Sequence, residues 1–120
     1  SSDLHSAHMI SKDLVAASSR ALILSILTEG ESYGYAIIQR VKELSEEQLQ
    51  WTDGMLYPIL HRLEAEGHIR SFWKVADNGR KRKYYQLEQS GQSALEEQKL
   101  QWHQVHNTLM KLWQTNLTSI

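Results

Sequence analysis

Cysteine is absent from this chain of 120 residues, so neither a disulfide nor a zinc site with thiolate ligands can stabilise its fold. Apolar runs are short: residues 21–24 form one of them, and it ends at Ser25. A helix that crosses a bilayer needs roughly 18 to 20 such residues in a row. We therefore expect a cytoplasmic protein that does not bind a membrane.

The sequence motifs of common catalytic sites are also missing. There is no cysteine nucleophile, no glycine-rich phosphate loop and no G-x-S-x-G pattern. His103 and His106 are three residues apart, which can place both on one helix face and leaves a metal-responsive regulator as an alternative. Because no supporting carboxylate or thiolate accompanies them, solvated polar positions explain them more simply. We predict a protein without enzymatic activity, cofactor or metal.

The charge of the chain is nearly balanced, at −1, but it is unevenly placed. Residues 68–85 carry six Lys and Arg against Asp77 alone, whereas the rest carries seven against thirteen acidic residues. A basic segment on a mildly acidic body orients a protein toward an anionic polymer. The alternative is a solvated charged turn.

Three helices are predicted before the basic segment. Apolar residues at helical spacing indicate a helix over 13–28, with Leu14, Ala17, Ala21, Leu24 and Leu27 on one face. Ser32 is a candidate N-cap for a second helix, whose apolar stripe is Ile37, Ile38, Val41 and Leu44. Thr52 is a candidate N-cap for a third helix that ends at Gly67.

The third helix has two unlike faces. Leu56, Ile59, Leu60 and Leu63 fall within about 100° of arc and form the predicted core face. The opposite face has no bulky aliphatic side chain and consists of Gly54, Tyr57, Pro58, His61, Arg62 and Ala65. Small residues permit close approach, and the polar ones can donate to phosphates or base edges. We expect this face to enter the major groove of duplex DNA.

A β-hairpin follows the third helix. Residues 69–75 alternate in polarity, Asn78-Gly79 is predicted to supply a pair of positive φ angles, and residues 80–87 return. Trp51 and Trp73 are expected to pack against the helical body. The predicted contacts of the hairpin with DNA are Lys74, Asn78, Arg80, Lys81, Arg82 and Lys83. The predicted fold is mainly α with a small β-hairpin: a winged helix-turn-helix plus a C-terminal helix.

Residues 54–67 and 80–85, together with Ser32-Tyr33-Gly34-Tyr35 and residues 20–27, resemble the PadR family of bacterial transcriptional regulators, in particular its small subgroup. The resemblance covers roughly residues 11–112. It implies a dimeric winged-helix repressor that contacts DNA through the second helix, including Ser32 and Tyr33, the third helix and the wing. It also implies dimerisation through the last helix.

The last helix carries a heptad pattern of its own. Leu95, Trp102, Val105, Leu109 and Leu112 occupy a and d positions, with Gln98 at one d position. We interpret this stripe as a homodimer interface that would place two copies of the third helix on a palindromic operator, about 34 Å or a multiple of it apart. Residues 1–8 are expected to be a cloning remnant, residues 9–88 the DNA-binding domain and residues 89–117 the dimerisation helix.

Trp102 is the candidate ligand contact. Some small PadR-like regulators stack flat aromatic compounds between symmetry-related tryptophans of this helix, and the resemblance implies a similar site here. The predicted lining is Trp102, Gln98, Lys99, Val105 and His106. The alternative is ordinary interface packing, because aromatic residues are enriched in interfaces. A repressor modulated by a planar aromatic ligand and a ligand-independent DNA-binding protein both remain open.

Overall fold

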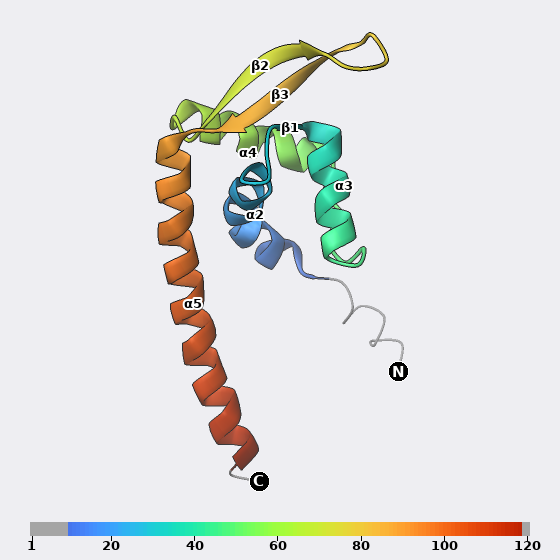
Figure 1. Ribbon diagram of the computed structural model, residues 1–120. Helices are drawn as coiled ribbons and strands as arrows, with labels where there is room; N and C mark the ends of the chain where they lie inside the picture. Colours follow the sequence, from blue (N-terminus) through green and yellow to red (C-terminus); the bar gives the residue numbers. More distant parts are fainter. Residues whose placement is uncertain (1–9, 119–120) are drawn as a thin grey trace.

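A computed structural model describes residues 10–118 of the chain, and side chains as far as residue 114. Residues 1–8, interpreted as a cloning remnant, lie outside the described part. The elements in chain order are α2 (Lys12–Leu27), β1 (Ser32–Tyr33), α3 (Gly34–Leu44), α4 (Asp53–Ala65), β2 (Ile69–Val75), β3 (Lys81–Leu87) and α5 (Gln89–Thr118) (Figure 1). The prediction of a mainly helical chain with a β-hairpin is confirmed.

Local capping chemistry explains where α4 begins and ends. The hydroxyl of Thr52 accepts a hydrogen bond from the backbone N–H of Met55, as expected of an N-cap. At the other end Gly67 has φ +81°, and the N–H groups of Gly67 and His68 donate to the carbonyls of Glu64 and Leu63. This is a Schellman motif, which favours glycine because of the positive φ.

The predicted cap of the second helix is wrong. Ser32 lies in β1, and Tyr33 takes the N-cap position of α3 without a capping hydrogen bond from its side chain. β1 pairs with β3 through Ser32 with Tyr85 and Tyr33 with Tyr84, so the sheet has three strands in the order β1-β3-β2. The backbone of Ser32 and Tyr33 therefore pairs with β3, and α3 starts directly after this pairing, at Gly34.

The hairpin turn also differs from the prediction. Gly79 alone has a positive φ there, +82°, while Asn78 does not. The N–H of Ala76 donates to the carbonyl of Arg80, and the N–H of Gly79 donates to the carbonyl of Ala76. The loop therefore has three residues, with a glycine in the left-handed region at its last position, which is a common alternative to the two-residue turn.

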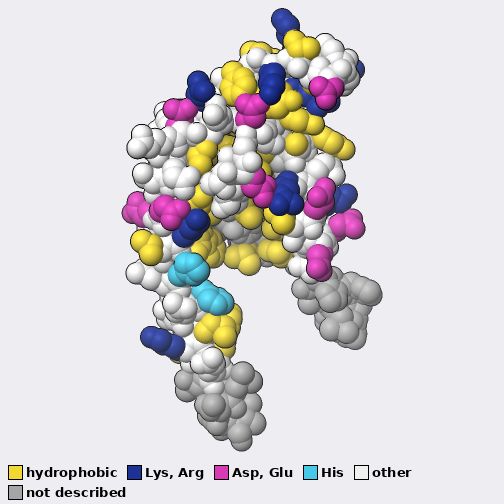
Figure 2. Space-filling model, in the orientation of Figure 1, with side chains coloured by type: hydrophobic (Ala, Val, Ile, Leu, Met, Phe, Trp, Pro, Cys, Tyr) yellow, Lys and Arg dark blue, Asp and Glu magenta, His cyan; other side chains and the backbone are white. Residues whose placement is uncertain are grey.

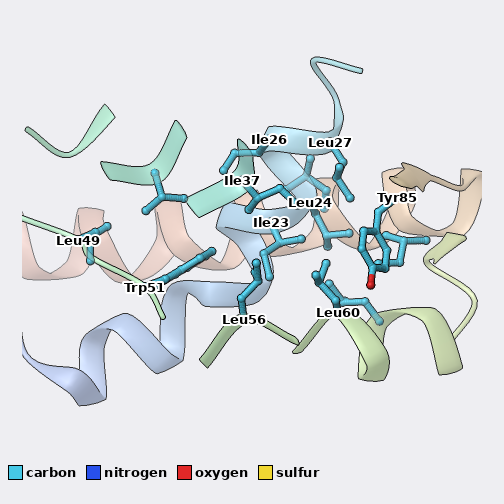
Figure 3. Packing of buried hydrophobic residues seen from close by; sticks show 14 of the residues in the cluster. Ile23, Leu24, Ile26, Leu27, Ile37, Leu49, Trp51, Leu56, Leu60 and Tyr85 are labelled. Atoms are coloured by element: carbon cyan, nitrogen blue, oxygen red, sulfur yellow. The ribbon is translucent and has the colours of Figure 1, made fainter. Parts of the chain in front are cut away.

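The hydrophobic core lies where α2, α3 and α4 meet the inner face of the sheet. Ile23, Leu24, Leu56 and Leu60 are fully buried and point toward one another and toward Tyr85 of β3 (Figure 3). Trp51 is buried, as predicted. Leu14 and Leu44, assigned to core stripes from their spacing, are exposed instead. The core is thus centred on the C-terminal half of α2.

The last helix starts in this core and then leaves it. Leu95 is 1% exposed and packs in the core of its own chain, so it does not belong to an intermolecular stripe as predicted. α5 has 30 residues, about 45 Å at 1.5 Å per residue, and its second half extends beyond the helical body (Figure 1). Among the described residues, no helix has the length and apolarity needed to cross a membrane.

Candidate nucleic-acid interface

The outward face of α4 is built by burial of the opposite one. Leu56, Leu60 and Leu63 are fully buried, which leaves Gly54, His61 and Arg62 exposed. Pro58 and Ala65 share this exposed face, and Thr52 fixes where the helix starts. α4 thus presents a narrow surface with hydrogen-bonding groups and few bulky side chains, as a helix that enters a groove requires.

Tyr57 differs from its neighbours because it is half-buried against α3. A Cβ atom built on Gly34 would lie 2.3 Å from the hydroxyl oxygen of Tyr57, so only a glycine allows this contact. The ring of Tyr57 also lies 6.4 Å from the imidazole of His61, between centroids. Gly34 therefore lets the start of α3 hold a side chain of the exposed face of α4 in place.

Cations gather on the wing, the hairpin of β2 and β3 (Figure 2). Arg80 and Lys81 are exposed near its tip, where the side-chain oxygen of Asn78 accepts the N–H of Arg80. The guanidinium of Arg82 lies 4.5 Å from the ring centroid of Tyr33 in β1. The ammonium of Lys83 lies 5.8 Å from that of Tyr85. Stacking on aromatic rings orients these cations while their charge remains available.

Lys74 is engaged within the chain. Its ammonium is hydrogen-bonded to the carboxylate of Glu31, and this hydrogen bond raises the pKa of Lys74. The ammonium also lies 5.0 Å from the ring centroid of Tyr84. Glu31 already offsets part of the positive charge of Lys74, which makes Lys74 a weaker candidate for phosphate than the cations of β3.

A groove of about 440 Å³ lies between the wing and the starts of α3 and α4, and we call it the wing groove. It is lined by Tyr33, Gly34, Tyr35, Tyr57, Trp73, Lys81, Arg82 and Lys83. All of these residues except Trp73 were predicted to contact DNA or belong to the sequence motif around Tyr33. The geometry therefore joins the second helix, the third helix and the wing in one surface.

Trp73 and Tyr35 are exposed aromatic residues of the groove that the sequence did not assign to the DNA contact. The prediction that Trp73 packs on the helical body is wrong, because its side chain is 67% exposed. Tyr35 is 66% exposed. Tyr35 belongs to the motif Ser32-Tyr33-Gly34-Tyr35, which was a usable signal, whereas nothing in the alternation of β2 marks where the strand passes beyond the core.

Three of the five residues predicted to contact a ligand on α5, Gln98, Trp102 and Val105, line one groove. A groove of about 310 Å³ is lined by Ala17, Gln98, Gln101, Trp102 and Val105. Lys99 does not line it and its ammonium lies 3.1 Å from the carboxylate of Glu96. His106 is exposed and does not line it either. Within residues 10–114, no three His, Asp or Glu side chains are grouped so as to hold a metal ion.

Comparisons with known proteins agree with this geometry. The family model described as "Transcriptional regulator PadR-like family" matches residues 23–97. A transcriptional regulator of Mycobacterium tuberculosis is 37% identical over 86 residues, which cover 72% of this chain and 77% of that protein. Two solved structures have similar folds. A transcriptional regulator from Clostridium thermocellum has a TM-score of 0.78 at 28% identity, covering 86% of this chain and 97% of the other. A PadR-like transcriptional regulator from Bacillus cereus has a TM-score of 0.76 at 30% identity, covering 86% and 98%.

Proposed function

The chain belongs to the PadR-like family and is a transcriptional regulator rather than an enzyme, and from this premise we propose that it represses transcription as a homodimer bound to a palindromic operator. In the proposed complex the exposed face of α4 reads the major groove and the wing holds phosphates. Occupation of the operator would exclude RNA polymerase from the promoter.

One observation carries the DNA-binding part of the proposal. The wing groove brings Tyr57 of α4 and the cations Lys81, Arg82 and Lys83 of β3 to one surface. A reading helix and a phosphate-binding element must contact the same stretch of duplex, so they must share a face of the protein. Asp77 lines the neighbouring hollow of the wing, but four consecutive cations, Arg80 to Lys83, outweigh its charge.

The surface of α5 supports the homodimer. Val105, Leu109, Leu112 and Trp113 are exposed in the single chain, and hydrophobic side chains line the recess between α5 and the helical body (Figure 2). Trp102 borders two hollows, the one with Gln98 and a second of about 220 Å³ against Ser18, Ala21, Leu22 and Ser25 of α2. Exposed apolar side chains arranged in this way are typical of a surface that a second helix covers.

We place ligand control at the same helix. A flat aromatic compound that stacks on Trp102, between Gln98 and Val105, would alter the packing of the two copies of α5. That change would alter the distance between the two DNA-reading heads and weaken operator binding, by a coupling free energy of about 1 to 3 kcal/mol.

Selection of bound fragments from random duplex DNA tests the function directly. We expect recovery of an inverted repeat whose half-sites are about 10 base pairs, or a multiple of that, apart. The selection is repeated with a panel of planar aromatic compounds, which should reduce recovery. Recovery of no preferred sequence would contradict operator recognition, and an asymmetric sequence would contradict the two-fold dimer.

Trp102→Ala should abolish binding of the planar ligand and leave operator binding in place. The variant loses the indole on which the compound stacks, so it should no longer show quenching of tryptophan fluorescence by planar compounds, while its affinity for the operator changes less than about 3-fold. The control is Trp113→Ala, which removes another indole of α5 that does not line the groove with Gln98, so quenching at Trp102 should persist. Because Trp113 is exposed on the apolar surface that we assign to the dimer, the dimerisation of this variant is measured as well. Parallel loss of operator binding and of the dimer, measured by sedimentation, would assign Trp102 to interface packing alone.

A further inference from the structure

We propose that one strand of the DNA backbone lies in the wing groove, where Trp73 and Tyr35 pack on deoxyribose rings while Lys81 and Lys83 bind the adjacent phosphates. The proposal rests on the DNA-binding function proposed above and adds an apolar contact to it. The wing would then contribute to affinity in two ways, of which only one depends on salt.

The position of Trp73 on β2 is the first argument. Ile69 and Trp73 point to the same face of the strand, because side chains of a strand alternate with period two. Ile69 is buried over the helical core, whereas Trp73, four residues further out, is 67% exposed. The inner face of the wing thus continues past the edge of the core and presents an indole over the start of α3 rather than burying it.

The chemistry of the lining is the second argument. Three cations, Lys81, Arg82 and Lys83, line the groove together with four aromatic residues, and no acidic residue does. Trp73 pairs with Lys83 across the sheet, so an aromatic and a cationic side chain leave neighbouring strands on the same face. A nucleic-acid strand has the complementary pattern, since anionic phosphates alternate with sugars that expose C–H groups.

Continuity with the reading helix favours duplex DNA over a small anion. Tyr57 belongs both to the groove and to the outward face of α4, so a strand in the groove remains in contact with α4. The other hollow of the wing fits less well, because Asp77 lines it and the ammonium of Lys74 there is held by Glu31. We therefore assign the backbone strand to the wing groove.

The test uses the duplex recovered by the selection and measures Kd over a range of salt concentrations. Trp73→Ala should weaken binding about 10-fold at every salt concentration, which corresponds to about 55 Å² of apolar surface buried against the sugars. The slope of log Kd against log salt should stay as in the unchanged protein. Lys83→Ala should instead reduce that slope by about 0.9 for each phosphate that the variant no longer binds.

Two further variants control for general damage. Trp73→Phe keeps an aromatic ring and should recover most of the affinity. Leu100→Ala removes a side chain that is 66% exposed, similar to Trp73. Leu100 lies about 200° around α5 from Trp102 and so faces away from the proposed dimer surface. The Leu100→Ala variant should therefore bind DNA as the unchanged protein does. Both should match the thermal unfolding midpoint of Trp73→Ala, because neither Trp73 nor Leu100 belongs to the core.

The outcomes separate this proposal from the function itself. If the unchanged protein binds the selected duplex and Trp73→Ala binds equally well, the sugar contact is wrong and the regulator function stands. A reduced salt slope in Trp73→Ala would also overturn it, because the indole would then serve only to place Lys83. If the unchanged protein binds no duplex, both proposals fail.

Discussion

Replacing Arg80, Lys81, Arg82 and Lys83 together by alanine should lower the affinity for duplex DNA by about 100- to 1,000-fold at physiological salt. Each phosphate contact releases counterions from the duplex, which contributes a slope of about 0.9 to the dependence of log Kd on log salt. Arg80 and Lys81 are exposed at the tip, and Arg82 and Lys83 line the wing groove. The variant should therefore show a lower salt slope as well as weaker binding.

The measurement is fluorescence anisotropy with labelled operator and with unrelated duplex, across a series of salt concentrations. A charge-matched control replaces Lys12, Lys42, Lys99 and Lys111 of α2, α3 and α5, which lie outside the wing. This control removes the same number of positive charges, but none from the wing. It should therefore change the salt slope much less than the wing variant does. An unchanged slope in the wing variant, or equal slopes in the two variants, would remove the wing from the DNA contact.

Periodicity predicted the elements that are long enough to repeat a pattern. The three helices of the DNA-binding domain and both strands of the wing appear within a few residues of their predicted bounds. β1 was missed because two residues show no period, and Ser32 resembles an N-cap in the sequence. Its partners, Tyr84 and Tyr85, lie far along the chain, so the pairing is decided by tertiary structure alone.

Alternation and heptads indicate which residues share a face but not what that face meets. Trp73 shares a face with Ile69, yet the core ends between them. Leu95 fits the heptad of α5 with Val105, yet it packs in its own chain while Val105 is exposed. The extent of a core depends on how many elements reach a given position, and one stretch of sequence does not contain that information.

The candidate DNA site was the more predictable of the two sites. Its cations are consecutive in the sequence, so the sequence alone locates them. The contact of Tyr57 with Gly34, in contrast, depends on the packing of α3 on α4. Around Trp102 the heptad pattern did not show which side of α5 the groove occupies, so Lys99 and His106 were assigned to it although they do not line it. Gln98 and Val105 lie about 40 to 60° from Trp102 on the side facing α2, whereas Lys99 and His106 lie about as far on the other side.

Gly91→Ala should destabilise the protein by about 2 to 3 kcal/mol, although it adds only one methyl group. Gly91 is buried in the first turn of α5, against His68, which precedes β2, and Leu87 at the end of β3. An added Cβ would lie 2.1 Å from the carbonyl oxygen of His68 and 3.0 Å from its carbonyl carbon. That carbonyl already accepts the N–H of Glu88, so it cannot move without breaking the bond that holds α5 to the base of the wing.

Gly54→Ala is the matched control for this substitution. Gly54 also lies in the first turn of a helix, but the nearest atom to an added Cβ is the hydroxyl oxygen of Thr52, at 3.8 Å. With space available, the alanine should stabilise the protein by about 0.5 to 1 kcal/mol, because glycine loses more backbone entropy on folding. Urea unfolding followed by circular dichroism measures both variants. Equal unfolding free energies of the two variants would contradict the prediction. They would show that α5 can shift away from His68 at little cost in stability, and therefore that its first turn is not rigidly fixed to the DNA-binding domain.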